Sequence, residues 1–293
     1  MIKPADLPFN KRGAVYHLDL RAEELADLVI TVGDPGRVQQ VSQYFDRVEV
    51  QRIHREFVTH TGYIGNQRLT VISTGIGMPN IDIVMTELDA LANLDVESRS
   101  FREKTKRLSI IRLGTTGGIK EECRPGDVIV SQYGIGFDTL MQYYEFPRSQ
   151  NLLELQSALE IQLRGETGPF FVAEADQNLL DGFKSLGVVG ISATCGGFYG
   201  PQGRSLRLPL RYPNFLNALK EFSFSGLGIT NLEMETAAIL GLGSALGHRC
   251  LSISVVLTNR MNGDFLSSSR INIDKLIISF LEKVPHVFTA STS

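Results

Sequence analysis

The feature that most constrains the fold is a pattern that recurs along the chain: an apolar run, a turn segment and then a helical pattern. Five of these runs are rich in Val, Ile and Leu and show little alternation of polar and apolar residues, which is typical of strands buried on both faces. The runs are DLVITV (27–32), RLTVIST (68–74), LSIIRL (108–113), GVVGISAT (187–194) and LSISVVLT (251–258). Strands that alternate with helices in this way predict an α/β protein.

Helical patterns lie between these apolar runs. They cover roughly residues 36–45, 79–93, 151–164, 176–186, 212–222, 234–247 and 271–284. Gly65 and Asn66 separate two β-type stretches and predict a hairpin turn, which makes the sheet mixed rather than purely parallel. We therefore predict a three-layer α/β/α sandwich around a mixed central sheet. Because the sequence has no linker, repeat or low-complexity tract, we expect one domain over residues 1–293.

Composition and charge exclude several classes of protein. The 29 basic and 32 acidic side chains give a net charge of −3, so no global field favours a nucleic acid. Three cysteines without a CxxC pair are typical of a reducing cytosol. The N-terminus lacks the apolar core of a signal peptide, and the apolar stretch AAILGLGSALG is too short to span a bilayer. We expect a cytoplasmic protein that binds neither nucleic acid nor membrane.

Two segments interrupt the α/β pattern. Residues 97–107 carry five basic and two acidic side chains, which favours a solvated loop; a small nucleic-acid-binding patch is the alternative. Residues 204–213 (RSLRLPLRYP) combine arginines with prolines. This segment predicts an irregular loop that acts as a lid near a site.

Two turn segments that follow predicted strands favour an anion site. Residues 33–37 (GDPGR) join glycine and arginine at the start of a helix, and Arg112 precedes residues 114–118 (GTTGG). Ligands of α/β proteins bind at the carboxyl ends of strands, where loop amides, helix N-termini and arginines hold anions. Each segment alone also fits a simple tight turn. Neither is a Walker A or G-x-G-x-x-G motif, so together they predict a site for a small phosphate-like anion.

Three further segments offer polar groups for a ligand. Residues 198–204 (FYGPQGR) combine an aromatic face, an amide and a cation, which suits a flat heterocycle; a glycine-rich loop is the alternative. Residues 233–236 (EMET) begin a helix, where acids either favour the helix dipole or accept hydrogen bonds from vicinal sugar hydroxyls. Residues 54–57 (HREF) alone are compatible with a surface ion pair.

In this order, the motifs GDPxR, HREF, STGIG, RxGTTGG, FYxxQxR and EMET resemble the nucleoside phosphorylase-I family, and most closely its uridine phosphorylase branch. The resemblance covers about residues 14–285. It implies that uridine and phosphate react to give uracil and α-ribose 1-phosphate. Inorganic phosphate is then a co-substrate, and no cofactor is expected. The resemblance also implies a homodimer with shared active sites, which bacterial members often assemble into hexamers.

The resemblance implies a role for each residue that matches a motif. For phosphate binding it implies Gly33, Arg37, Arg55, Arg112 and Thr115. For ribose binding it implies His17, Met234 and Glu235, and for base binding Phe198, Gln202 and Arg204. The catalytic residues that it implies are Arg112, Arg204 and Glu235. Arg55 and His17 are expected to reach the site of the neighbouring subunit.

The chain also departs from the patterns of related families. Some bacterial members hold a monovalent cation near the positions of Glu56 and the Ile76 carbonyl, but Asn80 replaces a small residue there. We therefore expect no metal, and a monovalent cation near Glu56 and Ile76 is the alternative. The purine branch places an aspartate where this chain has Asn259 and Arg260, which favours a pyrimidine. A purine or broad-specificity nucleoside phosphorylase remains the alternative enzyme, and a non-catalytic nucleoside-binding protein remains the alternative outside enzymes.

Overall fold

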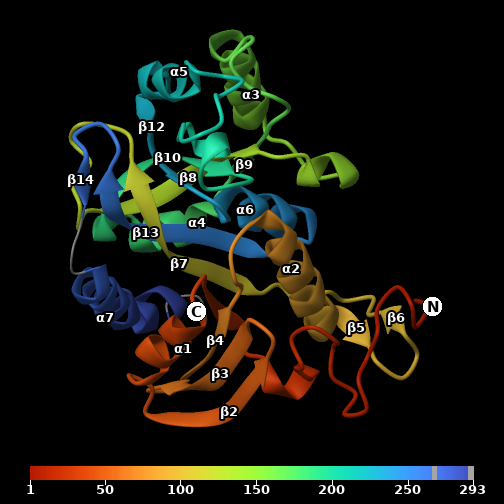
Figure 1. Cartoon of the computed structure of the whole chain (residues 1–293). Helices are drawn as coiled ribbons and strands as arrows, with labels where there is room; N and C mark the ends of the chain where they lie inside the picture. Colours follow the sequence, from red (N-terminus) through yellow and green to blue (C-terminus); the bar gives the residue numbers. More distant parts are fainter. Residues whose placement is uncertain (266–268, 290–293) are drawn as a thin grey trace. The chain divides into compact units, whose positions relative to one another are not determined.

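The computed structural model describes residues 1–265 and 269–289. The chain forms two compact units (Figure 1). Unit 1 comprises residues 1–111 and 246–249, and unit 2 comprises residues 112–245 and the described residues after 249. The expectation of one domain over residues 1–293 therefore stays a prediction.

Unit 1 contains a mixed sheet in the order β1-β4-β3-β2. Its strands are β1 (Leu28–Val32), β2 (Arg47–His54), β3 (Phe57–Ile64) and β4 (Gln67–Ser73). β1 runs parallel to β4, whereas β3 pairs antiparallel with both β4 and β2. Gly65 and Asn66 connect β3 to β4, and Gly65 has a φ of 56°, which glycine adopts without strain. The predicted hairpin turn is confirmed.

The helices of unit 1 begin where its strands end. The further elements are η1 (Ala22–Glu24), α1 (Pro35–Ser42), α2 (Met78–Asn93) and the short pair β5 (Leu94–Asp95) and β6 (Ser100–Phe101). Asp34 caps α1 by accepting a hydrogen bond of 2.8 Å from the Gly36 amide, and Pro35 suits the first turn. α1 packs on β3 and β4. The Asp34 cap fixes the first turn of α1 directly after the end of β1.

Unit 2 is built around strand β8, which pairs on both edges. The strands are the end of β7 (Ser109–Gly118), β8 (Val128–Phe137), β9 (Phe171–Glu174), β10 (Val188–Cys195), β11 (Ser223–Phe224), β12 (Leu227–Glu233), β13 (Arg249–Asn259) and β14 (Asp264–Phe265). β10 runs parallel to β8 and β12. The other edge of β8 pairs antiparallel with β13 and then with β9. The prediction of an α/β fold around a mixed sheet is confirmed.

The helices of unit 2 follow the predicted helical patterns with small shifts at their ends. They are η2 (Leu140–Tyr143), α3 (Gln150–Gln162), α4 (Gln177–Phe183), η3 (Lys184–Leu186), η4 (Gly200–Gln202), α5 (Phe215–Glu221), α6 (Thr236–Ala245) and α7 (Ser269–Thr289). α6 is almost wholly apolar because it packs on β8, β9 and β10 (Figure 1). It therefore holds its first turn rigidly against the sheet.

A ladder of buried polar side chains crosses the strands of unit 2. The Ser131 and Ser192 hydroxyls lie 2.7 Å apart, and the Ser192 hydroxyl donates to Asn231 Oδ1 at 2.9 Å. Asn231 Nδ2 in turn donates to Thr116 Oγ1 at 2.8 Å. Buried polar groups are stable when each has a partner. The ladder thus ties β8, β10 and β12 to the end of β7.

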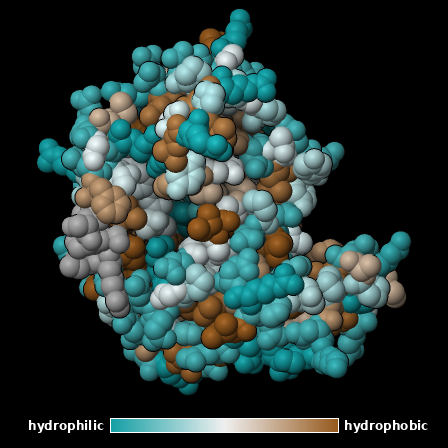
Figure 2. All heavy atoms as spheres, viewed as in Figure 1, coloured by the Kyte–Doolittle hydropathy of each residue, from teal (hydrophilic) through white to brown (hydrophobic). Residues whose placement is uncertain are grey.

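Hydrophilic side chains predominate on the face of the molecule in Figure 2, and hydrophobic ones form small groups among them. Such a mixture is normal for a protein surface in water. Among the described residues, no helix is both long enough and apolar enough to cross a bilayer.

Candidate active site

Arg112 and Glu235 form the buried centre of the candidate site in unit 2. Arg112 lies on β7 and Glu235 directly precedes α6, and each is 5% exposed. Arg112 Nη2 lies 2.6 Å from Glu235 Oε2, and Arg112 Nη1 donates to Ser254 Oγ at 2.8 Å. A guanidinium has more N–H donors than these contacts use. The side chain can therefore bind a further anion while it keeps both partners.

The charge of Arg112 is stable despite its burial. Burial works to lower the pKa of Arg112, but the carboxylates of Glu233 and Glu235 outweigh it and raise this pKa. The guanidinium folds back over Gly114, because a Cβ on that glycine would lie 1.8 Å from Arg112 Nη1. The first glycine of the GTTGG segment is thus required by the arginine that precedes it.

The two glutamates of the EMET segment have different hydrogen-bond partners. Glu233 Oε2 accepts hydrogen bonds from the Glu235 and Thr236 amides at 2.9 and 2.8 Å, and its other oxygen accepts one from the Thr194 hydroxyl. These contacts satisfy N–H groups at the start of α6, as a capping residue does. Glu235 instead turns its carboxylate to Arg112. Met234, between them, is half-buried.

The alternation of β7 separates the two threonines of the GTTGG segment. Thr116 is buried, and its hydroxyl donates to the Leu232 carbonyl at 2.7 Å. Successive side chains of a strand point to opposite faces. Thr115 therefore points away from this network, and it is partly accessible. Thr116 thus supports the strand, whereas the role expected of Thr115 in phosphate binding stays a prediction.

The residues predicted to bind a base lie in one group at η4. Arg204 Nη1 donates to Gln202 Oε1 at 2.6 Å and to the Phe198 carbonyl at 2.5 Å, and its guanidinium carbon lies 3.9 Å from the centre of the Phe198 ring. Gln202 is 3% exposed and Phe198 is 51% exposed. The structure thus brings an amide, a cation and an accessible aromatic face together.

Arg260 adds a second cation to this group. Its Nη1 donates to the Gln202 carbonyl at 2.8 Å, and its amide donates to the Gly118 carbonyl at 2.9 Å. Burial and, second to it, the nearby charge of Arg260 together lower the pKa of Arg204 to about 10. Burial also lowers the pKa of Arg260. The sequence analysis missed Arg260 as a site residue, although it noted that no acid stands there.

The cysteine beside these groups is not a nucleophile. Cys195 ends β10 and is fully buried. Burial raises the pKa of its thiol, and the negative charge of Glu233 adds to this increase. Because the thiolate is the reactive form, a protonated buried thiol has a structural role.

Two predicted phosphate residues lie in unit 1 at the end of β1. Gly33 directly follows β1, and a Cβ on it would lie 3.5 Å from the Gly75 carbonyl. Arg37 lies in the first turn of α1 and is 9% exposed. Helix N-termini favour anions because unpaired amides and the helix dipole point there. The GDPGR segment thus begins a helix, as predicted, and its role in anion binding stays a prediction.

A second cluster in unit 1 unites His17 with Arg55. Arg55 and Glu56 form the tip of the hairpin between β2 and β3. The guanidinium of Arg55 lies over the ring of Tyr16, 5.6 Å from its centre, and this ring meets His17 edge to face at 5.1 Å. Arg55 is exposed and has a φ of 55°, which is strained for a residue other than glycine. The two residues expected to serve a neighbouring subunit therefore lie together.

Glu87 holds His17 from the buried side. It is 3% exposed, and its Oε1 lies 2.6 Å from His17 Nδ1. It also accepts hydrogen bonds from the His17 amide at 3.1 Å and the Leu18 amide at 2.9 Å. A carboxylate at Nδ1 fixes the tautomer that bears its proton there. In a neutral imidazole held in this way, Nε2 is the acceptor.

Near Glu56 and Ile76, where some related proteins hold a monovalent cation, this chain places the side-chain amide of Asn80. Asn80 Nδ2 donates to Glu56 Oε1 at 3.3 Å, and a Cβ on Gly75 would meet the same Nδ2 atom at 2.4 Å. Ile76 is 72% exposed. Among the described residues, no group of three or more His, Cys, Asp or Glu side chains could hold a metal ion. The amide donor competes with a cation for Glu56.

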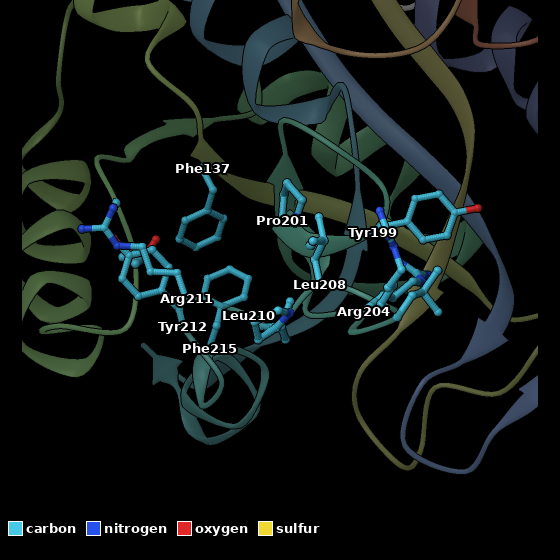
Figure 3. Close-up of a pocket in the computed structure, with 15 residues that line it drawn as sticks. Phe137, Tyr199, Pro201, Arg204, Leu208, Leu210, Arg211, Tyr212 and Phe215 are labelled. Atoms are coloured by element: carbon cyan, nitrogen blue, oxygen red, sulfur yellow. The ribbon is translucent and has the colours of Figure 1, made fainter.

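Unit 2 also contains a cavity of about 670 Å³ (Figure 3). Its walls come from Phe137 at the end of β8, from the loop at residues 167–168, and from the segment 199–215. The predicted irregular loop at 204–213 lines it. Of the predicted site residues, Arg204 takes part in its wall, and the others lie elsewhere. We refer to it as the loop cavity.

Comparisons with known proteins show which family the chain belongs to. A model of the phosphorylase superfamily matches residues 27–282. The uridine phosphorylase of Thermococcus kodakarensis is 28% identical over 267 residues, which cover 89% of this chain and 83% of that protein. The uridine phosphorylase of Haemophilus influenzae is 30% identical over 255 residues, which cover 84% of this chain and 86% of that protein.

A solved structure extends the likeness to three dimensions. A nucleoside phosphorylase from Trypanosoma brucei, whose crystal structure shows uridine phosphorylase activity, has a TM-score of 0.87 to this chain at 31% identity, over 95% of this chain and 98% of that one. The fold is thus that of an α/β protein, with a buried ion pair of Arg112 and Glu235 beside the strand ends where such folds bind ligands. The chain belongs to the phosphorylase superfamily. The resemblance found in the sequence is confirmed.

Proposed function

We propose that this chain is a nucleoside phosphorylase that converts uridine and phosphate into uracil and α-ribose 1-phosphate. The observation that carries the proposal is the buried pair of Arg112 and Glu235, which joins an anion-binding cation to a sugar-binding carboxylate. The two uridine phosphorylases and the trypanosomal enzyme, which match most of the chain, support the choice of substrate. Phosphate is a co-substrate in this proposal, and no cofactor takes part.

Phosphate binding is assigned to Arg112 and Thr115 in unit 2. Arg112 keeps its charge through Glu233 and Glu235, so it can hold a phosphate dianion. Gly33, Arg37 and Arg55 take the same role by their match to the family motifs. A phosphate oxygen attacks the anomeric carbon, the bond from this carbon to the base nitrogen breaks, and the configuration inverts. Positioning and fixed charges supply the catalysis.

Ribose binding is assigned to Glu235, with Met234 against the sugar. The Glu235 carboxylate faces Arg112, so its acceptor oxygens are fixed where phosphate and sugar meet. A carboxylate can accept hydrogen bonds from two vicinal hydroxyls. As the bond to the base breaks, positive charge develops on the sugar ring, and phosphate and carboxylate both stabilise it.

Base binding is assigned to Phe198, Gln202 and Arg204, to which we add Arg260. The Gln202 amide can accept from the uracil N3–H and donate to O2, and the Phe198 ring can stack on the base. The leaving uracil takes the electron pair of the broken bond. The two guanidiniums beside Gln202 stabilise this negative charge.

We propose that two copies of the chain share their sites. Arg55 and His17 lie in one cluster, as they must if both enter the same neighbouring site. Tyr16 and Ile53 beside them are 43% and 75% exposed, which suits a surface that a second copy covers. Dimer and hexamer both satisfy this requirement. The family model spans both units, which supports one functional domain over residues 1–293.

We also propose a cytoplasmic location. Cys123, Cys195 and Cys250 are all buried and free of disulfides, which fits a reducing compartment.

A purine or broad-specificity phosphorylase is the second candidate. A purine leaves more readily when an acid protonates its N7 atom, and this chain has Asn259 and Arg260 at the position expected for that acid. Asn259 donates to the Lys120 and Cys123 carbonyls at 2.9 and 2.7 Å, which is a structural role. Uridine is therefore favoured over inosine.

An ultraviolet assay tests the proposed function. Purified protein is mixed with uridine or inosine, with and without phosphate, and base release is followed by absorbance. We expect phosphate-dependent cleavage of uridine and much slower cleavage of inosine. Faster inosine cleavage would reassign the roles of Gln202 and Arg204. Binding of uridine without any turnover, measured by calorimetry, would support the non-catalytic alternative.

A further inference from the structure

One wall of the loop cavity consists of aromatic rings that the core of unit 2 holds in place. Phe137 and Phe215 meet edge to face with ring centres 4.8 Å apart, a preferred geometry of aromatic pairs. Phe215 belongs to the buried core of unit 2, against which Phe137 and Tyr212 also pack. Figure 3 shows these three rings gathered at one end of the cavity. Their positions are thus set by the core and are available before any ligand binds.

The loop that forms the other wall exposes apolar side chains to water. Leu206 and Leu208 line the cavity and are 75% and 72% exposed. Burial of apolar surface away from water is stabilising. These side chains gain that stabilisation when a ligand fills the cavity, and a volume near 670 Å³ suits a small organic molecule. The cavity is therefore complementary to a ligand with an apolar body.

The charged side chains that line the cavity are all cations. They are Arg204, Arg207 and Arg211. Arg204 donates to neutral acceptors, and Arg211 lies 5.5 Å from the centre of the Tyr212 ring. Figure 3 places Arg204 and Arg211 at opposite ends of the cavity. An anionic group on the ligand would meet cations at either end, and the described lining contains no carboxylate to repel it.

We propose that the loop cavity binds a small aromatic anion. The rings of the ligand lie against Phe137, Tyr212 and Phe215, and its negative group lies beside the arginines of the wall. An aromatic body is favoured over an acyl chain because aromatic walls and guanidiniums both present flat faces for stacking. The cavity shares Arg204 with the proposed base site, but it is a distinct space, since Gln202 and Phe198 do not line it.

Occupancy of the cavity affects the base segment, and this consequence rests on the proposed function. Tyr199, Pro201 and Arg204 belong to the segment that also carries Gln202, and they line the cavity. An anion beside Arg204 attracts the guanidinium that otherwise stabilises the leaving uracil. We therefore expect an aromatic anion to lower kcat for uridine.

Fluorescence of 8-anilinonaphthalene-1-sulfonate, an aromatic anion, tests binding to the full chain without nucleoside. We expect saturable binding of one molecule per chain. Leu208→Glu places a carboxylate at the mouth of the loop cavity, and it should weaken the affinity for the anionic probe by about tenfold or more. Ile161→Glu is the matched control, because Ile161 is 71% exposed on α3 and does not line the cavity. Equal effects of the two substitutions would overturn the proposed location.

A second comparison tests the charge and the aromatic body. The double variant R207A/R211A should weaken the anionic probe several-fold but leave the uncharged N-phenyl-1-naphthylamine unchanged. The double variant R148A/R164A is the control, because both arginines are exposed and lie outside the cavity lining. Equal binding of charged and uncharged probes to the unmodified chain would overturn the anion assignment. Displacement by dodecanoate at lower concentration than by 2-naphthoate would overturn the aromatic assignment.

The coupling to the base segment is measured last. We expect the probe to lower kcat for uridine in the unmodified chain and to have little effect in Leu208→Glu. Probe binding without any uridine turnover would contradict the proposed function and leave the cavity site intact. Normal turnover with no effect of a saturating probe would contradict the coupling alone.

Discussion

At the scale of single residues, neighbouring side chains of one type divide the work of the site. Glu233 uses both carboxylate oxygens to cap α6 and hold Thr194, whereas Glu235 pairs with Arg112. Sequence reasoning placed both acids at a helix start, but it could not choose between a dipole role and a ligand role. Which role each glutamate takes depends on the strand end that its carboxylate faces. The order of the strands in the sheet decides this, and the local sequence does not show it.

This division predicts different results for two matched substitutions. Glu233→Gln replaces the capping carboxylate and should lower the free energy of unfolding by about 1 kcal/mol, with a smaller loss of activity because Glu233 Oε2 also lies 3.4 Å from Arg112 Nη2. Glu235→Gln removes the nearest charged partner of the buried Arg112 and the charge that faces the sugar, so it should also destabilise the protein and should lower kcat/KM for uridine by about 100-fold. Denaturant unfolding and steady-state kinetics measure the two effects. A fall in activity confined to Glu233→Gln would reverse the assignment.

Glu87 is predicted to act through His17. Glu87→Gln weakens the grip on His17 Nδ1 and should raise KM for uridine several-fold, because His17 then presents its Nε2 acceptor less often to the ribose 5′-hydroxyl. The variant should leave KM unchanged for 5′-deoxyuridine, which lacks that hydroxyl. Asp89→Asn is the control on the same helix, since Asp89 lies near His248 instead. Equal losses with both substrates would point to a purely structural role.

The pair of arginines at the base site predicts an alkaline limit of activity. Burial lowers the pKa of Arg204 to about 10, and Arg260 contributes in the same direction. Activity should therefore fall as the pH rises through this value and Arg204 loses its proton. Arg260→Ala removes a like charge, so the fall should move to higher pH even though overall activity is lower. The kcat profile of both proteins with uridine, whose own ionisation is common to both, measures the shift. An unmoved or lowered limit would contradict the coupling.

At the scale of elements, strands and turns place the charged groups. The buried runs that the sequence marks as strands all form strands, because continuous Val, Ile and Leu leave few other options. Among the longer strands, β2, β8, β9 and β12 were not predicted. β12 buries Thr230, Asn231 and Glu233, which no hydrophobicity pattern marks as core. Only the partners on neighbouring strands make these polar residues stable, so their strand could not be predicted from its own sequence.

Two residues of the candidate sites lie outside the sequence motifs and were not predicted. Arg260 follows a predicted strand, and Glu87 lies inside a predicted helix, where an acid normally faces water. Their roles depend on contacts with Gln202 and His17, which are distant in the sequence. The glycine and arginine motifs were predictable because their local geometry already favours an anion.

At the hairpin tip between β2 and β3, one substitution should stabilise the protein and at the same time weaken phosphate binding. Arg55 has a positive φ, so Arg55→Gly should raise the free energy of unfolding by about 1 kcal/mol. The same change should raise KM for phosphate, because the guanidinium is lost. Ser225→Gly is the matched control, since Ser225 also has a positive φ of 50° and lies in an exposed turn of unit 2. It should stabilise the protein and leave KM unchanged. Equal kinetics in both variants would remove Arg55 from the site.

At the scale of the whole molecule, the chain supplies two sets of residues with different tasks. Unit 2 gathers Arg112, Thr115 and Glu235 with the base segment, and unit 1 presents His17 and Arg55 in one exposed cluster. A chain that served only its own site would have no need to display a strained arginine at a hairpin tip. The proposal of shared sites accounts for this display.

In the proposed reaction phosphate, and not water, cleaves the nucleoside. Phosphorus-31 nuclear magnetic resonance of a reaction with uridine and phosphate distinguishes the two nucleophiles. We expect the signal of inorganic phosphate to be converted into that of α-ribose 1-phosphate, in a one-to-one ratio with the uracil released. Arg112→Ala should abolish this conversion. Release of uracil with an unchanged phosphate signal and free ribose would contradict the account, because water would then be the nucleophile.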